Sequence, residues 1–148
     1  MRKIIGWKES VDLPDLNIFG IPAKIDTGAR TSVLHCNHIE LVAYDGIQRI
    51  KFQPLDNRFI SSDQTYLFPF RGLRTIKNSF GQEEDRYVIN TVITLFGERY
   101  DIELSLRDRS EMEFPLLLGR KFIKRRFLVD VSKSNLSSST PHTITTLS

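Results

Sequence analysis

The chain has little of what a cross-linked or membrane-spanning protein needs. Cys36 is its only cysteine in 148 residues, so no disulfide can form within the chain. No apolar run approaches the roughly 20 residues of a membrane-spanning helix. The N-terminal stretch MRKIIGWKE regains charge too soon for a signal peptide. We therefore expect a cytoplasmic protein without a membrane partner, large enough to bury a core without cross-links.

Motifs for ATP binding and for zinc hydrolysis are also missing. The sequence contains no G-x-x-x-x-G-K-S/T loop to hold phosphates and no H-E-x-x-H pair of zinc ligands. Its three histidines are His35, His38 and His142, and no glutamate stands between the first two as a general base. We expect a structural role at the surface for His35 and His38, no metal site and no cofactor.

Positive charge is in slight excess, with a formal net charge of +3 and a pI of about 9.1. Basic residues cluster in the run GRKFIKRRF, residues 119–127. Such a run is most often a solvated face of the protein. An acidic peptide is a partner that would suit it, and nucleic acid is the less favoured alternative.

The composition divides the chain into a folded domain and a tail. Residues 1–131 carry regularly spaced apolar residues and predict one domain. Residues 132–148 read SKSNLSSSTPHTITTLS, which is rich in Ser and Thr and poor in large apolar residues. Such a segment buries too little surface to offset its ordering entropy, so we expect a flexible tail.

Within the domain, short strands separated by turns predict an all-β fold. Asp45-Gly46 lies between two apolar-rich runs and is typical of a tight hairpin turn, and Gly97 marks a second hairpin. The run FPLLLG suits a strand buried on both faces, and RKFIKRRF after Gly119 suits about two turns of helix. Many short strands of this kind favour a small β-barrel or sandwich.

Two separated motifs carry a family resemblance. Asp26-Thr27-Gly28-Ala29 follows the apolar Ile25, and Leu-Leu-Leu-Gly-Arg follows about ninety residues later, at 116–120. This pairing resembles the retropepsin-like aspartic peptidases. The stretches AKIDTGARTS, RTIKNSFGQEEDRYVI and PLLLGR are together similar to one bacterial and archaeal family, which carries the label "ATP-dependent zinc protease". Some members of that family are associated with ATP-grasp glutamate ligases.

The resemblance implies a closed all-β acid-protease barrel of six to eight strands, with one short helix near the C-terminus. It implies Asp26, Thr27 and Gly28 as catalytic residues and Ala29 as a substrate contact. Aspartic chemistry needs two carboxylates that share one proton, and no second Asp-Ser/Thr-Gly triplet occurs in the chain. The family solution is a homodimer in which Asp26 meets its own copy.

The resemblance also implies a hairpin flap over the substrate, at about residues 73–88, with Ser79, Phe80 and Gly81 at its tip. Three acids lie in that tip, where retroviral flaps are rich in glycine. A working flap and a plain solvated hairpin therefore both remain open.

Arg30 stands where retroviral members carry an acid, so Arg120 lacks its usual local partner. Either Asp108 or Glu111 neutralises these cations, or the cleft accepts an anionic substrate, with Arg74 and Arg86 adding to a positive surface. Arginine suits carboxylate recognition. By analogy with the associated ligases, acidic peptide tails are the expected substrate class.

The sequence thus predicts an aspartic endopeptidase that acts as a homodimer on a peptide or protein substrate, functionally linked to a glutamate ligase. Two alternatives remain. One is a peptide-binding module on the same barrel that does no chemistry. The other is a zinc-dependent protease, as the family label says.

Overall fold

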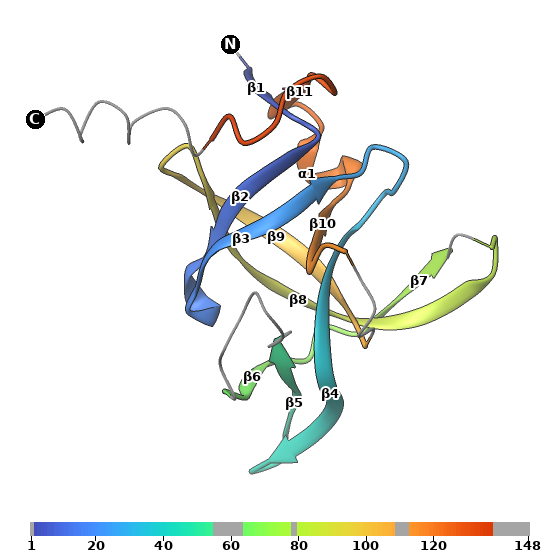
Figure 1. Cartoon of the computed structure of the whole chain (residues 1–148). Coiled ribbons are helices and arrows are strands. Elements are labelled where there is room, and N and C mark those ends of the chain that lie inside the picture. Colours follow the sequence, from blue (N-terminus) through green and yellow to red (C-terminus); the bar gives the residue numbers. More distant parts are fainter. Residues whose placement is uncertain (1, 55–63, 78–79, 109–112, 138–148) are drawn as a thin grey trace, which may run out of the picture.

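Short β-strands make up most of the chain in the computed structural model (Figure 1). The structure describes residues 2–54, 64–77, 80–108 and 113–137. The strands are β1 (Lys3–Ile5), β2 (Lys8–Leu13), β3 (Ile18–Ile25), β4 (Ser32–Tyr44), β5 (Ile47–Pro54), β6 (Tyr66–Pro69), β7 (Leu73–Lys77), β8 (Glu83–Leu95), β9 (Glu98–Arg107), β10 (Leu116–Leu118) and β11 (Phe127–Val129). The helical elements are a 3-10 turn, η1 (Pro14–Leu16), and a short α-helix, α1 (Arg120–Ile123). The predicted all-β fold with one short helix is confirmed.

Both predicted hairpins are present. β4 pairs with β5 across the Asp45-Gly46 turn, and β8 pairs with β9 across Phe96-Gly97. The two residues of each turn have positive φ angles, of 52° and 75° in the first turn and 54° and 74° in the second. Two-residue turns of this kind match the right-handed twist of the paired strands. The glycine at each second position adopts such angles without steric cost.

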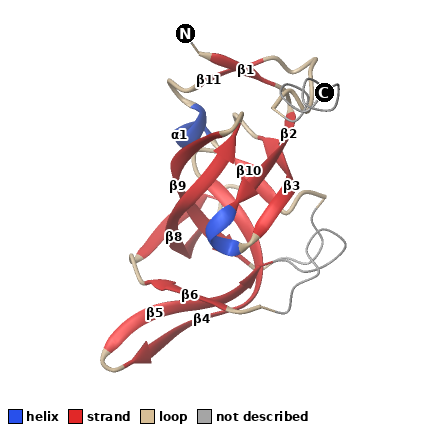
Figure 2. Cartoon of the chain, turned by 90° about the vertical axis from the view of Figure 1, so that its left-hand side faces the viewer, coloured by secondary structure: helices blue, strands red, loops and turns tan. Residues whose placement is uncertain are grey.

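Six strands pair in a closed ring. The order of hydrogen-bonded neighbours is β10-β3-β2-β8-β9-β4, and a further pairing of β4 with β10 returns to the start. In Figure 2 these strands form the body of the molecule, and the β4–β5 hairpin projects below it. β10 is parallel to β3 and antiparallel to β4. Both edges of β10 are thus paired. Leu116 and Leu118 are buried, whereas Leu117 is half-buried, so the strand is fully buried on one face and not on both as the apolar run predicted.

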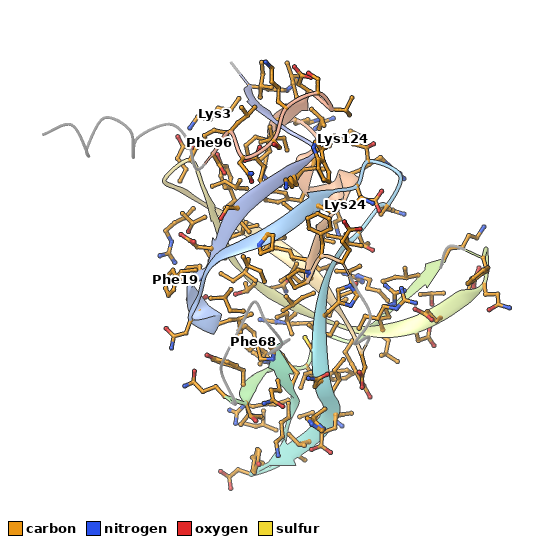
Figure 3. All side chains as sticks on the ribbon, in the orientation of Figure 1. Lys3, Phe19, Lys24, Phe68, Phe96 and Lys124 are labelled. Atoms are coloured by element: carbon orange, nitrogen blue, oxygen red, sulfur yellow. The ribbon has the colours of Figure 1, made fainter. Side chains whose placement is uncertain are left out.

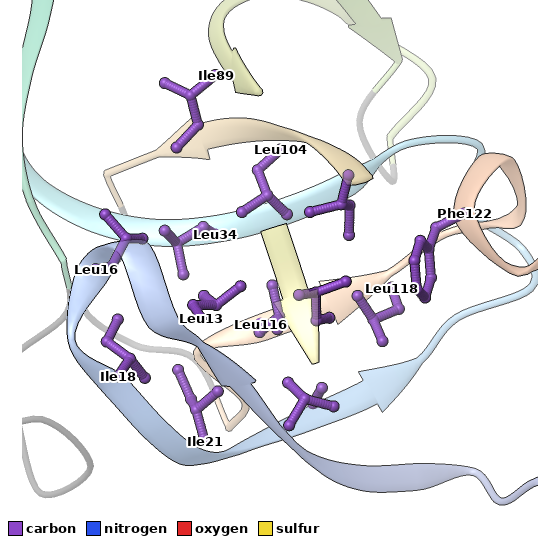
Figure 4. Packing of buried hydrophobic residues seen from close by; sticks show 14 of the residues in the cluster. Leu13, Leu16, Ile18, Ile21, Leu34, Ile89, Leu104, Leu116, Leu118 and Phe122 are labelled. Carbon is purple, nitrogen blue, oxygen red and sulfur yellow. The ribbon is translucent and has the colours of Figure 1, made fainter. Parts of the chain in front are cut away.

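Apolar side chains of the ring strands fill its interior. Leu34, Leu104, Leu116 and Leu118 are fully buried, and Figure 4 shows them packed together with Ile21. Each such leucine contributes about 1.5–3 kcal/mol through its removal from water. This core holds the end of β3 against the end of β10, where the two sequence motifs lie.

The terminal strands pair with each other outside the ring. β1 and β11 form a two-stranded parallel sheet, at the top of Figure 1. Residues 132–137 then run back along the start of β2, where the Trp7 N–H donates to the Lys133 carbonyl at 2.9 Å. This part of the segment predicted as a tail is therefore bonded to the domain. The rest of the predicted tail, residues 138–148, lies outside the described residues.

Glu9 is a fully buried carboxylate that holds this C-terminal segment. Its Oε1 accepts hydrogen bonds from the N–H and the hydroxyl of Ser137, both at 2.8 Å. Its Oε2 accepts from the N–H groups of Gly6 at 2.8 Å and Leu136 at 3.1 Å. A buried carboxylate needs such donors, because it has lost its hydration.

No helix among the described residues is long and apolar enough to cross a membrane. The expected cytoplasmic location stays a prediction.

Candidate active site

Asp26 lies on a tight loop directly after β3. Its N–H donates to the Leu118 carbonyl at 2.9 Å, which continues the pairing of β3 with β10 by one residue. Its Oδ1 accepts from the Gly28 N–H at 3.1 Å, and its carbonyl accepts from the Ala29 N–H at 3.2 Å. The side chain of an aspartate commonly stabilises a turn in this way. Asp26 is half-buried while Thr27 and Gly28 are exposed, so the carboxylate is fixed and still open to a ligand.

The late Gly-Arg motif closes this loop from the other side. The Arg120 N–H donates to the Ala29 carbonyl at 2.8 Å, and the Lys121 N–H donates to the Arg30 carbonyl at 2.9 Å. The Arg120 guanidinium donates through Nη1 to the Thr27 carbonyl at 3.0 Å. Two motifs 93 residues apart thus satisfy each other's backbone groups at one place.

Gly119 is required where the two motifs cross. A Cβ at this position would lie 2.6 Å from the Thr31 carbonyl oxygen, closer than side-chain carbons approach a backbone oxygen. The Gly119 N–H donates to the Ser32 hydroxyl at 3.0 Å, and the Ser32 carbonyl accepts from the Ser105 hydroxyl at 3.0 Å. The glycine therefore permits the close contact that brings Arg120 to the loop.

Asp26 opens onto a cavity of about 740 Å³. Of the residues predicted to act there, Gly28, Ala29, Arg30, Arg86 and Arg120 line it together with Asp26. Its other lining residues are Thr31, Val33, Thr75, Ile76, Lys77, Arg107 and Leu117. Sequence reasoning assigned no role to Lys77, although it lies in the stretch RTIKNSFGQEEDRYVI, or to Arg107, which belongs to none of the quoted stretches. Both follow from the strand pairing, which places the ends of β7 and β9 at the same cavity.

Five cations line this cavity, and two of them, Arg86 and Arg107, share one acidic partner, whose single charge offsets one of the two. Glu84 accepts from Arg86 Nε at 2.6 Å, and its Oε1 lies 3.8 Å from Arg107 Nε. The sequence offered Asp108 or Glu111 for this role; Glu111 lies outside the described residues. Among the described residues, no carboxylate oxygen lies within 4.0 Å of a charged nitrogen of Arg30, Lys77 or Arg120. The cavity around Asp26 is therefore positively charged.

Arg74 does not line this cavity, although the sequence assigned it to the substrate cleft. Its guanidinium binds Glu103 through two bonds, Nη2 to Oε1 at 2.7 Å and Nε to Oε2 at 3.3 Å. Lys121 Nζ lies 3.4 Å from the same carboxylate. The hydrogen bond from Arg74 lowers the pKa of Glu103, against the opposing effect of burial. Arg74 thus ties β7 to β9.

The predicted hairpin over residues 73–88 is formed by β7 and β8, whose register runs from Leu73↔Tyr87 to Lys77↔Glu83. Thr75, Ile76 and Lys77 bring one side of this hairpin to the Asp26 cavity. Near its tip, Phe80 is 85% exposed and Gly81 has a φ of 80°. Ser79 lies outside the described residues. A hairpin beside the site is established, and its action as a flap stays a prediction.

The two early histidines do not share one environment. His35 is fully buried on β4, so the expected surface position is wrong for it, whereas His38 is exposed. Cys36 between them is buried, and burial, aided by the charge of Asp108, raises the pKa of its thiol. The part of the chain that the structure describes holds no cluster of three or more potential metal ligands.

Residues 4–140 match the family model of RimB-like proteins, described as "Retropepsin-like aspartic endopeptidase RimB". The chain belongs to the RimB-like family. The resemblance read from the two motifs is thereby confirmed, and the motifs that meet at Asp26 lie inside the matched region.

Segments of longer proteins are similar to this chain, and so is one solved structure. Proteins named "Probable alpha-L-glutamate ligase" from Desulfotalea psychrophila and Shewanella pealeana are 39% and 36% identical to it, over 87% and 88% of the chain. The chain spans only 28% and 29% of their lengths. A crystal structure of a Legionella pneumophila protein of unknown function has a TM-score of 0.74 and 26% identity. That match covers 93% of this chain and 99% of the other.

Proposed function

We propose that the chain is an aspartic-type endopeptidase that acts as a homodimer. The observation that carries this proposal is the Asp26 loop, which is held open to a cavity by a backbone hydrogen bond that Asp26 donates to Leu118 and one that the loop accepts from Arg120. A loop so constrained keeps its carboxylate in one orientation, as a catalytic group requires. The retropepsin-like description of the family supports the same chemistry.

In the proposed reaction, two Asp26 carboxylates from two copies hold one water and share one proton. The ionised carboxylate takes a proton from the water, whose oxygen bonds to the scissile carbonyl carbon. The protonated carboxylate gives its proton to the carbonyl oxygen. Collapse of this tetrahedral intermediate breaks the C–N bond. The carboxyl that took the proton from water gives it to the leaving amine, and the other carboxylate takes a proton from a hydroxyl as the carbonyl re-forms. The exposed Thr27 would hold the two loops in register, and Gly28 would leave room for the substrate backbone.

We propose acidic peptide tails as the substrate class. Arg30, Lys77 and Arg120 line the Asp26 cavity without an acidic partner in the described part of the chain. Arginine binds carboxylates through its planar, forked donors. The similar proteins named as glutamate ligases support a functional link to an enzyme that adds glutamate.

The substrate class can be tested at Arg30. In an Asp26→Asn background, which prevents cleavage, calorimetry should show tighter binding of a glutamate-rich peptide than of a glutamine-rich peptide of equal length. Arg30→Ala should remove this preference, and Arg30→Lys should restore it in part, because lysine lacks the fork. Arg99→Ala, at the exposed end of the β8–β9 hairpin, is the matched control and should keep the preference. Equal affinities of the parent protein for both peptides would rule out an acidic substrate.

The zinc-dependent alternative can be tested with a chelator. Cleavage of the glutamate-rich peptide by the wild-type protein, followed by mass spectrometry, should be the same before and after treatment with EDTA. The melting temperature should also stay unchanged, because a carboxylate site loses nothing to a chelator. Loss of cleavage together with about one zinc per chain would instead support the metal-dependent reaction.

The binding-module alternative makes a different prediction for the same assay. A module that keeps the positive cavity but does no chemistry would bind the glutamate-rich peptide and leave it intact under every condition. Specific cleavage products from purified wild-type protein would exclude it.

A further inference from the structure

A second cavity, of about 540 Å³, lies beside the Asp26 loop. It is lined by Thr27, Arg30, Arg120, Lys121, Ile123 and Lys124. Four of these six residues are cationic, and three come from the basic run that the sequence placed after Gly119. Figure 3 shows Lys124 beside α1, where it is the residue that follows the last helical turn. This run is therefore gathered around the loop of the proposed catalytic residue.

Three of the four cations keep their charge uncompensated. Lys121 lies 3.4 Å from Glu103 and is partly neutralised. Arg120 donates to the Thr27 carbonyl, which carries no net charge. Within the described ranges, no carboxylate oxygen lies within 4.0 Å of a charged nitrogen of Arg30, Arg120 or Lys124. The surface beside Thr27 is thus positive in the isolated protomer.

A two-fold axis at Asp26 would bring two such surfaces together. When two Asp26 carboxylates come within hydrogen-bond distance, the adjoining Thr27 loops meet, each with an Arg120 bonded to it. The dimer would therefore hold six uncompensated cations, namely Arg30, Arg120 and Lys124 from each copy. The two carboxylates that share a proton supply a single negative charge. Like charges at this density oppose association.

We propose that an acidic peptide is needed to assemble the dimer, because its carboxylates neutralise the Arg30, Arg120 and Lys124 surfaces of both copies. The substrate would then build its own active site, and free protomers would be inactive. This inference rests on the proposed function, since it requires that Asp26 meet its copy. It goes further in making the acidic chain a condition of assembly.

Salt dependence gives the clearest test. Added salt screens the repulsion between the two cationic surfaces and so favours the peptide-free dimer, whereas it weakens the attraction between these surfaces and an acidic peptide. Charges act over about 10 Å at 0.1 M salt and about 3 Å at 1 M. Sedimentation velocity of the wild-type protein should show mainly monomer at 25 mM NaCl, and a dimer dissociation constant at least about tenfold lower at 500 mM NaCl. In the Asp26→Asn protein, which does not consume the probe, a ten-residue glutamate peptide should produce dimer at 25 mM NaCl. A glutamine peptide of equal length should not.

Two variants separate this effect from a general effect of salt. Lys124→Gln removes one cation from each surface, so its dissociation constant at 25 mM NaCl should move toward the wild-type value at 500 mM. Lys51→Gln removes the same charge from the distal β4–β5 hairpin, where Lys51 pairs with Glu40 at 3.7 Å. It should leave the dissociation constant unchanged.

Several outcomes would overturn the inference. They are a dimer equally tight at both salt concentrations without peptide, a dimer that salt dissociates, and a glutamate peptide that binds the monomer without association. Any of these, combined with peptide cleavage that requires Asp26, would leave the proposed peptidase intact. If the peptide induced dimers of the Asp26→Asn protein but the wild-type protein cleaved no peptide, the assembly would be supported and the proposed peptidase activity contradicted.

Discussion

Asp26→Asn should abolish peptide cleavage, with a loss of turnover of several orders of magnitude, as for other essential catalytic groups. The amide keeps the size of the carboxylate and keeps an oxygen that can accept from the Gly28 N–H, so the loop should hold. It can neither take a proton from water nor share one with its copy. Turnover of a glutamate-rich peptide, measured by mass spectrometry on purified protein, is the measurement. Melting temperature serves as the check on the fold.

The matched control for this change is Asp45→Asn. It makes the same replacement in the β4–β5 turn, where φ is 52° and asparagine is as well suited as aspartate. Its turnover and melting temperature should equal those of the wild type. If purified Asp26→Asn retained wild-type turnover, the peptidase assignment would be wrong.

Gly119→Ala should cause the largest loss of stability among single methyl additions at the site. The added carbon would lie 2.6 Å from the Thr31 carbonyl oxygen and 2.9 Å from the Arg30 carbonyl carbon. Both are backbone atoms, and the Arg30 carbonyl accepts from the Lys121 N–H at 2.9 Å, so the backbone cannot move aside without disturbing the loop. Overpacking of this kind costs about 3 kcal/mol, or about 6–12 °C in the melting temperature of a domain this size. Thermal unfolding followed by circular dichroism measures it.

The control for this change is Gly46→Ala. At that turn nothing lies within 4 Å of an added carbon, but φ is 75°. It therefore isolates the cost of the backbone angle, about 1–2 kcal/mol. If Gly119→Ala unfolded at the wild-type temperature, the close crossing of the two motifs would not be needed.

The core of the site could be predicted from sequence because its contacts demand particular residues. The Asp26 side chain stabilises its turn by accepting from the Gly28 N–H, and only a glycine fits at position 119. Because these contacts require particular residue types, they appear in the sequence as short motifs, and such motifs can be recognised in related chains. Turn chemistry likewise fixed both tight hairpins through Gly46 and Gly97.

Pairings between side chains of distant strands left no such trace. Arg74 and Arg86 were both expected to add to a positive surface at the cleft, yet Arg74 binds Glu103, 29 residues away on β9. Nothing in the local sequence indicates which acid a given arginine will face. Glu84, which neutralises Arg86, was overlooked for the same reason.

His35 shows a different limit. Alternation along a strand predicts one buried face, but residues 32–36 of β4 are all buried. At this point β4 pairs with β9, and the His35 N–H also donates to the Pro115 carbonyl at 3.0 Å. β4 therefore has hydrogen-bonded neighbours at both of its edges here, and the burial of five consecutive residues means that both of its faces are covered too. In a strand that is buried on both faces, the alternation of polar and apolar residues does not predict where a polar side chain such as that of His35 will lie.

The buried Glu9 sets where this domain can be cut. Three of its four hydrogen-bond donors come from Leu136 and Ser137, so a fragment that stops at residue 131 leaves its carboxylate with the Gly6 N–H alone. The hydrogen bonds of Glu9 would also transmit a force applied to the C-terminal segment. A pull on the chain beyond Ser137 reaches Glu9 on β2 directly, and the neighbouring Trp7 carbonyl accepts from the N–H of Ile25, the residue before Asp26, at 2.8 Å. The chain after Ser137 is therefore connected through Glu9 and β2 to the Asp26 loop.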